Sequence, residues 1–161
     1  MVYRIKEAFW SWGNDFAITD AAGRPCFRVD GRAFSWGDKL SFQNAAGQEL
    51  AFINQTLLSL KPRYRIERGG HMLAEVVKEF SWLRQKFTLD IPGPNDYTIE
   101  GSFWEHEFTF TRLSRRAARV SKSYWSWTDS YGVDIANDED EILILCACIV
   151  IDQVLFDERK K

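Results

Sequence analysis

An aromatic-Ser-Trp tripeptide recurs along the chain of 161 residues and constrains its fold more than any other feature. Its copies are Trp10-Ser11-Trp12, Phe34-Ser35-Trp36, Phe80-Ser81-Trp82 and Trp125-Ser126-Trp127, with Leu58-Ser59-Leu60 as a degenerate copy. The spacing of roughly 23 residues is typical of repeated supersecondary units. After most copies an alternating apolar run begins, as at residues 16–20 and 40–44, and such runs predict strands. The repeat therefore predicts one β-hairpin per unit and an all-β meander.

The first two hairpins have nearly the same sequence. Residues 16–20 lead to 26–29 through Ala21-Ala22-Gly23, and residues 40–44 lead to 50–53 through Ala45-Ala46-Gly47. Asp20 and Asn44 are expected to open the two turns, and each glycine to adopt a positive φ.

The later units complete a set of about twelve strands, counted by the same hairpin pattern. The third pairs 64–68 with 72–78, the fourth pairs 87–89 with 97–99, and the fifth pairs 108–112 with 118–122. The fifth turn, around residues 114–116, lacks glycine, so its boundaries are less clearly defined. The sixth unit offers only residues 131–135, and a first strand is expected at residues 2–8.

The partner of the last strand is replaced by an apolar segment. Residues 137–141 are polar and mostly acidic, the next ten residues, 142–151, are all apolar, and the chain ends in basic residues 159–161. These charges suit the two ends of a helix dipole and predict a helix over about 138–156. Its abundance of β-branched residues leaves a strand as the alternative. The helix is apolar on every side and must be buried, yet its apolar core is shorter than the roughly 20 residues that span a bilayer.

The helix requires burial on every side, and the sheet of about twelve strands requires partners for its two edge strands. Both requirements are met if the sheet closes around the helix. The predicted fold is therefore β-dominated: a closed antiparallel barrel of about twelve strands enclosing a hydrophobic C-terminal helix. A single domain is expected over residues 1–161.

Composition excludes several classes of protein. The formal net charge of −2 argues against non-specific nucleic-acid binding, which requires a basic surface. Three cysteines, Cys26, Cys146 and Cys148, suit reduced thiols better than a disulfide framework and favour a cytoplasmic protein. The N-terminus has no apolar segment typical of a signal peptide, so export is not expected.

The sequence resembles the tubby C-terminal-like superfamily, and within it the LURP-one-related family. The residues that carry the resemblance are Thr128 to Ile135, Asp140, the apolar helix to Asp152, and the hairpins at Gly23 and Gly47. It implies a twelve-stranded barrel threaded by a hydrophobic helix. Tubby proteins bind phosphoinositide headgroups through basic side chains on the barrel surface, and the more distant phospholipid scramblases act at membranes.

Two basic clusters are candidate sites for an anionic headgroup. Lys61, Arg63 and Arg65 alternate along one strand and share a face. A second cluster, around the fifth hairpin, consists of Arg112, Arg115, Arg116, Arg119 and Lys122. If the two lie side by side they form an anion-attracting patch. The alternative is that each is an ordinary solvated surface.

Other conspicuous residues favour structural roles. The seven tryptophans could anchor to a membrane or stack on ligands, but their placement in the repeat favours packing. In a strand His106 would point away from Glu105 and Glu107, which argues against a metal or acid–base site. His71 has no evident partner in the sequence.

Residues of the predicted helix also favour structural roles. Cys146 and Cys148 point to different sides of the helix and are expected to pack in the core. Asp152, if buried, needs a hydrogen-bond partner and is expected to hold the helix within the barrel.

Three functions remain open. The favoured one is a non-catalytic barrel, cytoplasmic or peripheral to a membrane, that recognises anionic phospholipid headgroups without a cofactor or metal and does not span the membrane. The second is a scaffold that binds a protein partner. The third is an enzyme with a carboxylate or His106 centre, although the sequence has no nucleophile–base pair or metal-ligand spacing.

Overall fold

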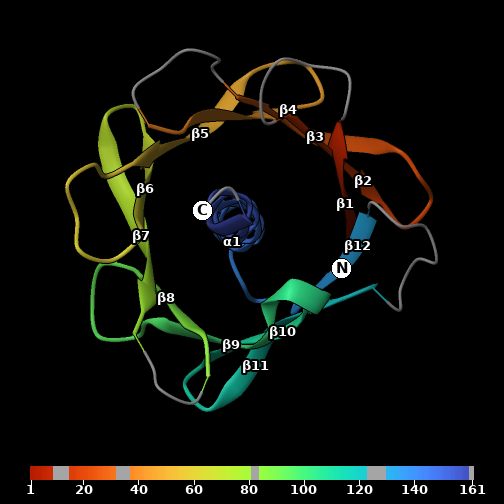
Figure 1. Ribbon diagram of the computed structural model, residues 1–161. Coiled ribbons are helices and arrows are strands. Elements are labelled where there is room, and N and C mark those ends of the chain that lie inside the picture. The colour runs from red at the N-terminus through yellow and green to blue at the C-terminus, as the bar shows by residue number, and fades with distance from the viewer. Residues whose placement is uncertain (9–14, 32–36, 81–83, 123–129, 160–161) are drawn as a thin grey trace.

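The computed structural model shows a closed antiparallel barrel wrapped around one helix (Figure 1). It describes residues 1–8, 15–31, 37–80, 84–122 and 130–159. In these residues each strand pairs with its neighbours in sequence, and β1 pairs with β12 to close the ring. The predicted fold class, including the twelve strands and the enclosed helix, is confirmed.

The elements follow one another as a meander. The strands are β1 Val2–Ala8, β2 Asp15–Asp20, β3 Pro25–Gly31, β4 Lys39–Asn44, β5 Glu49–Gln55, β6 Arg63–Arg68, β7 His71–Glu79, β8 Lys86–Asp90, β9 Tyr97–Ser102, β10 Glu107–Arg112, β11 Arg115–Ser121 and β12 Ser130–Ile135. A short 3₁₀ helix, η1 Phe103–Glu105, joins β9 to β10, and the helix α1 Glu141–Arg159 follows β12.

The meander gives the barrel two distinct rims. The upper rim holds the β5–β6 connection (residues 56–62), η1 and the last turn of α1, and it faces the viewer in Figure 1. The lower rim holds the alternate hairpin turns, such as the β2–β3 and β4–β5 turns, and the start of α1. The helix therefore runs along the barrel axis from the lower rim to the upper rim.

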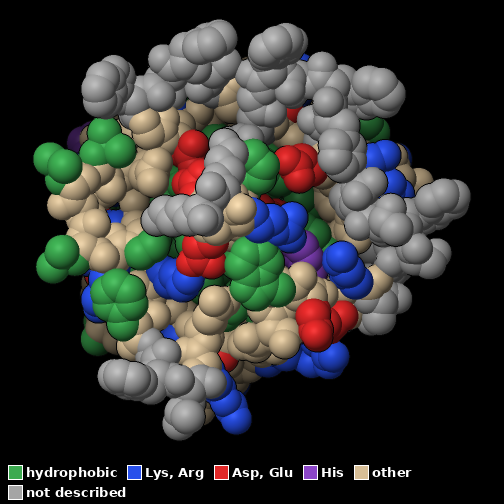
Figure 2. Space-filling view, in the orientation of Figure 1, with side chains coloured by type: hydrophobic (Ala, Val, Ile, Leu, Met, Phe, Trp, Pro, Cys, Tyr) green, Lys and Arg blue, Asp and Glu red, His purple; other side chains and the backbone are tan. Residues whose placement is uncertain are grey.

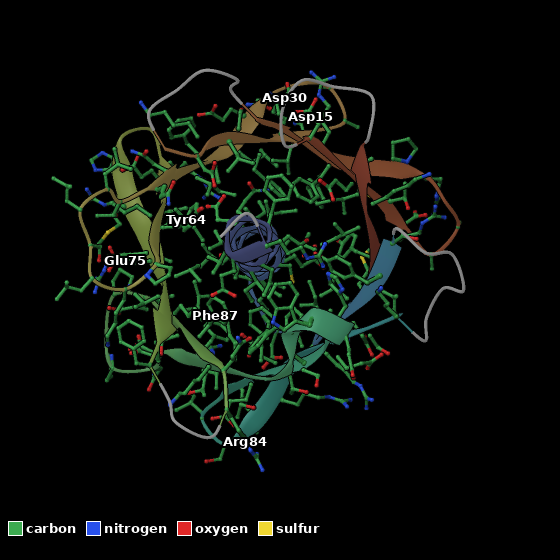
Figure 3. All side chains as sticks on the ribbon, in the orientation of Figure 1. Asp15, Asp30, Tyr64, Glu75, Arg84 and Phe87 are labelled. Atoms are coloured by element: carbon green, nitrogen blue, oxygen red, sulfur yellow. The ribbon has the colours of Figure 1, made fainter. Side chains whose placement is uncertain are left out.

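The core fills the space between the barrel wall and α1. Every residue from Ile144 to Ile151 is fully buried. Strand side chains such as Tyr64 and Phe87 project from the wall into this space, as Figure 3 shows. Because α1 is covered on all sides by the barrel, its apolar surface is removed from water. Among the described helices none combines the length and apolar character needed to cross a membrane.

The first two hairpins form as predicted. The Oδ1 atom of Asp20 accepts the backbone N–H groups of Ala22 and Arg24, both at 2.9 Å. Asn44 makes the equivalent bonds with Ala46 and Gln48 at 3.0 and 2.9 Å. Gly23 and Gly47 adopt φ of 82° and 86°. Each side chain thus replaces backbone partners in its turn, which pins the register of its hairpin.

The β10–β11 turn differs from the prediction. It is a tight turn at Leu113 and Ser114, with φ of 53° and 61°, so β11 begins at Arg115 rather than near residue 118. Two successive positive φ values define the type I′ turn that matches strand twist, and here non-glycine residues adopt it. The helix is displaced from the predicted range of 138–156 to Glu141–Arg159.

Most copies of the tripeptide repeat lie outside the described residues, including all of its tryptophans. The described members are exposed: Leu58 at 105%, Leu60 at 96% and Phe80 at 72% of their full surface. For these members the packing interpretation is wrong. They belong to connections at the upper rim, beyond the strands whose side chains fill the core.

Gly101, in β9, allows β10 to approach closely after η1. Its φ is 144°, and a Cβ atom built there would contact the Glu107 carbonyl oxygen and lie 2.6 Å from the Cα atom of Phe108. Gly47 also has a positive φ, but a Cβ atom there meets nothing within 4 Å.

We expect Gly101→Ala to destabilise the fold more than Gly47→Ala. Gly47→Ala should cost about 1 kcal/mol because of its left-handed backbone alone. Gly101→Ala should cost about 1–3 kcal/mol more, because the β10 backbone must move. Urea unfolding followed by circular dichroism measures both free energies, and equal costs would contradict the close approach.

Candidate functional site: a polar pocket at the upper rim

A pocket of about 270 Å³ opens at the upper rim between the last turns of α1 and the adjoining barrel wall. Its lining comes from β1, β2, β12 and α1, from the junction between η1 and β10, and from the residue that follows β11. The lining residues are Glu7, Phe16, His106, Lys122, Ser130, Tyr131, Asp152, Gln153, Leu155, Phe156 and Arg159. The pocket therefore combines charged, hydrogen-bonding and apolar side chains in a space suited to a small polar group.

The backbone at the end of η1 places His106 against the helix. His106 has φ 52° and ψ 45°, and its N–H donates to the Phe103 carbonyl oxygen at 3.0 Å. This left-handed conformation is uncommon for a residue other than glycine. The expectation that His106 sits in a regular strand between two glutamates is wrong, because Glu105 ends η1 and Glu107 begins β10.

Asp152 of α1 joins the helix to two parts of the wall. Its Oδ1 atom lies 3.0 Å from Nε2 of His106, and its Oδ2 atom accepts the Tyr131 hydroxyl at 2.5 Å. The His106 and Tyr131 rings stack with centroids 4.5 Å apart. Both carboxylate oxygens thus have a partner, as expected for a largely buried charge that holds the helix in place.

This cluster has the composition of an acid–base site but not its geometry. Nδ1 of His106 is buried and has no hydrogen-bond partner in the described residues, so no nucleophile is poised on it. Burial, and then the nearby Asp152 carboxylate, hold the pKa of the Tyr131 hydroxyl well above its usual value. Tyr131 is therefore a neutral donor at ordinary pH. The three residues act as a clamp between η1, β12 and α1.

The first predicted basic cluster is largely paired with carboxylates on the barrel wall. Lys61 binds Glu79 at 2.6 Å and Arg63 binds Glu75, while Arg65 lies 3.9 Å from Glu67. These cations retain little capacity to attract a further anion.

The second cluster is spread from one rim to the other. Arg112 binds Glu139 at 3.0 Å and lies over the Tyr97 ring, near the lower rim. Arg115, Arg116 and Arg119 are exposed on β11, while Lys122 follows β11 and lines the upper pocket. Strands β7, β8 and β9 separate β6 from β10, so the two basic clusters do not form one patch.

The remaining candidates are the three cysteines, His71 and Trp104. All three cysteines are free, and burial raises the pKa of the Cys146 and Cys148 thiols, in keeping with packing. His71 begins β7 and is exposed. Trp104 is 42% exposed on η1. The described residues include no group of His, Cys, Asp and Glu side chains that could hold a metal.

Comparison with known proteins agrees with this architecture. A family model described as LURP-one-related matches residues 1–152. The chain belongs to the LURP-one-related family. It is 38% identical over 155 residues to the uncharacterised protein YxjI of Bacillus subtilis, covering 96% of this chain and 94% of that protein. The X-ray structure of an Arabidopsis thaliana protein shares the fold at a TM-score of 0.68 and 17% identity, over 95% of this chain and 91% of that one.

In this LURP-one-related barrel, sequence reasoning identified Asp152 as an anchor but missed its partners. His106 and Tyr131 lie 46 and 21 residues away along the chain. The available signal was the apolar helix itself, because an aspartate at its end has to meet polar groups on the surrounding wall.

The Asp152 clamp should be measurable as a coupled unit. We expect Tyr131→Phe to lower the free energy of unfolding by about 1–3 kcal/mol, because it leaves a carboxylate oxygen without its donor. In a double-mutant cycle with Asp152→Asn, the two losses should be non-additive by about 0.5–3 kcal/mol. Urea unfolding provides the four free energies. Strictly additive losses would show that the two side chains do not act together.

Proposed function

We propose that this protein is a non-catalytic barrel that binds the surface of membranes containing anionic phospholipids, with its upper rim against the bilayer. The observation that carries the proposal is the concentration of exposed large apolar side chains at this rim. The other large apolar side chains that are exposed in the described residues, Met1, Met72 and Leu113, lie at the opposite end of the barrel.

The apolar groups of the upper rim come from separate elements. They are Leu57, Leu58 and Leu60 of the β5–β6 connection, Phe80 after β7, Trp104 of η1 and Phe156 of α1. Figure 2 looks onto this rim and shows hydrophobic side chains gathered at its left margin, over the β5–β6 connection. Exposed apolar groups at one end of a protein mark an interaction surface, and leucine and tryptophan suit the lipid interface.

Charge supports an anionic membrane as the partner. At the upper rim Glu79 and Glu158 are bound by Lys61 and Lys78. Lys122 and Arg159 form no ion pair with the described residues. Basic groups near a bilayer are attracted to anionic lipids, each by about 1 kcal/mol.

The lower rim carries both acidic and basic side chains. The acidic run from Asp138 to Glu141 precedes and begins α1 there. Arg115 and Arg116 also lie beside the lower-rim turn between β10 and β11, so the proposed orientation rests on the apolar groups of the upper rim.

Of the basic residues predicted from sequence, the proposal retains Lys122, which lines the upper-rim pocket, whereas Lys61 at the same rim is already paired with Glu79. The proposal assigns no headgroup contact to Arg63, Arg65, Arg112, Arg116 or Arg119, which lie on the wall or near the lower rim.

Flotation with phosphatidylcholine vesicles, with and without phosphatidylglycerol, tests the proposal. We expect flotation with the anionic vesicles, and we expect the double variant Leu58→Ser/Leu60→Ser to weaken it by at least tenfold. Burial of a leucine side chain contributes roughly 1.5–3 kcal/mol, which is at least tenfold in affinity. Leu113→Ser is the matched control, because Leu113 is exposed in a turn at the lower rim, and it should float like the wild type.

Two results would contradict the proposal. One is failure of the wild-type protein to float with either vesicle. The other is flotation that survives the leucine substitutions but is lost in Arg65→Glu/Arg116→Glu, which would place the contact on the barrel wall.

A further inference from the structure

Two cations of the upper-rim pocket have no counter-ion among the residues that the structure describes. Lys122 lines the pocket from the end of β11, and Arg159 lines it from the last turn of α1. Neither forms an ion pair with a described residue. The guanidinium of Arg159 lies 5.1 Å from the centre of the Trp104 ring, which holds it by a cation–π contact. One of the two cations is thus already oriented before a ligand arrives.

The carboxylate of Asp152 also lines this pocket. Its two oxygens are occupied by His106 and Tyr131. These hydrogen bonds leave its negative charge in place, but the two cations Lys122 and Arg159 outnumber it on this side of the pocket. Lys122 and Arg159 therefore give their part of the pocket a positive character.

Glu7 gives the pocket one region of opposite charge. Along β1, Tyr3 and Ile5 are buried in the core, and Glu7 follows them on the same face of the strand. Its carboxylate lies close enough to Tyr131 to contribute to the raised pKa of that hydroxyl. A ligand that fills the pocket meets a negative group on the β1 side and positive groups near α1 and β11.

We infer that this pocket binds a phosphoryl group that carries an amine, with the phosphate at Lys122 and Arg159 and the ammonium at Glu7. Phosphoethanolamine is the simplest compound of this class, either free or as the headgroup of a phospholipid. A cavity of about 270 Å³ is at the small end of ligand sites and accommodates a headgroup better than a large molecule. Arg and Lys bind phosphate through charge-assisted hydrogen bonds.

The inference deepens the proposed function, since the ligand can be a lipid headgroup, but the pocket can be tested without a membrane. Isothermal titration calorimetry of the full chain with phosphoethanolamine, glycerol phosphate, inorganic phosphate and ethanolamine separates the contributions of the phosphate and the amine. We expect phosphoethanolamine to bind at least tenfold more tightly than the other three.

Substitutions test the phosphate-binding residues and the ammonium-binding residue separately. Lys122→Ala and Arg159→Ala should each weaken phosphoethanolamine binding about tenfold, the loss of roughly one charge-assisted hydrogen bond. Glu7→Gln should abolish the preference for phosphoethanolamine over glycerol phosphate while phosphate binding persists. Arg116→Ala, on the exposed face of β11, is the control and should bind as the wild type. Thermal unfolding of each variant verifies that the barrel is intact.

Vesicles containing phosphatidylethanolamine or phosphatidylglycerol then distinguish the source of the ligand. Calorimetric binding of phosphoethanolamine without any flotation would support the pocket and overturn the proposed function. Flotation without calorimetric binding, and unchanged in Glu7→Gln, would support the membrane contact and overturn the pocket. Equal binding of glycerol phosphate and phosphoethanolamine would overturn the role of Glu7.

Discussion

The enclosure of an entirely apolar helix is the constraint on which the rest of the structure depends. Residues 144–151 of α1 are fully buried, and no face of this segment can meet water without cost. A two-layer sandwich would cover only part of such a helix, whereas a closed sheet covers all of it. Closure also leaves no unpaired strand edge, so one arrangement meets the requirements of the helix and of the sheet.

Enclosure confines polar chemistry to the two ends of the helix. Near its start, Tyr3 donates to Glu141 at 2.6 Å and Tyr97 donates to Glu139 at 2.5 Å. Near its end, Tyr131 donates to Asp152. In each case a wall tyrosine contributes its ring to the core and its hydroxyl to a carboxylate on or beside the helix. These contacts hold the helix at both rims and, together with the apolar packing between them, set its axial position.

Local features of the sequence were sufficient to predict most of the fold. Asp20 and Asn44 make their turn hydrogen bonds within four residues, so the sequence around them contains the whole interaction. The contact between His106 and Asp152 was not predictable in this way, because it depends on the barrel wall meeting the helix in three dimensions. The turn at Leu113 and Ser114 was also missed, since its positive φ values occur without the usual glycine.

The candidate site was predicted only in outline. Alternation places Arg63 and Arg65 on one face of β6, whereas Lys61 precedes the strand, and the carboxylates that neutralise these cations come from other positions, among them Glu75 and Glu79 on β7. The exposure of Leu58 and Leu60 was not predicted, because their likeness to the repeat suggested that they pack in the core. Repetition in sequence suggested equivalent packing positions along the meander, yet the members that the structure describes, Leu58, Leu60 and Phe80, lie at the rim rather than in the core.

The pairing of β1 with β12 also determines when this protein can acquire its structure. Residues 2–6 are hydrogen-bonded to residues 130–134, so the ring is incomplete until nearly the whole chain is available. The helix follows β12, and a helix surrounded by bulky core side chains cannot be threaded through a finished ring. The meander must therefore remain an open, curved sheet until α1 lies against it, and the β1–β12 seam closes last. Such long-range closure is characteristic of slow folding, during which the apolar inner surface and both sheet edges are exposed to other chains.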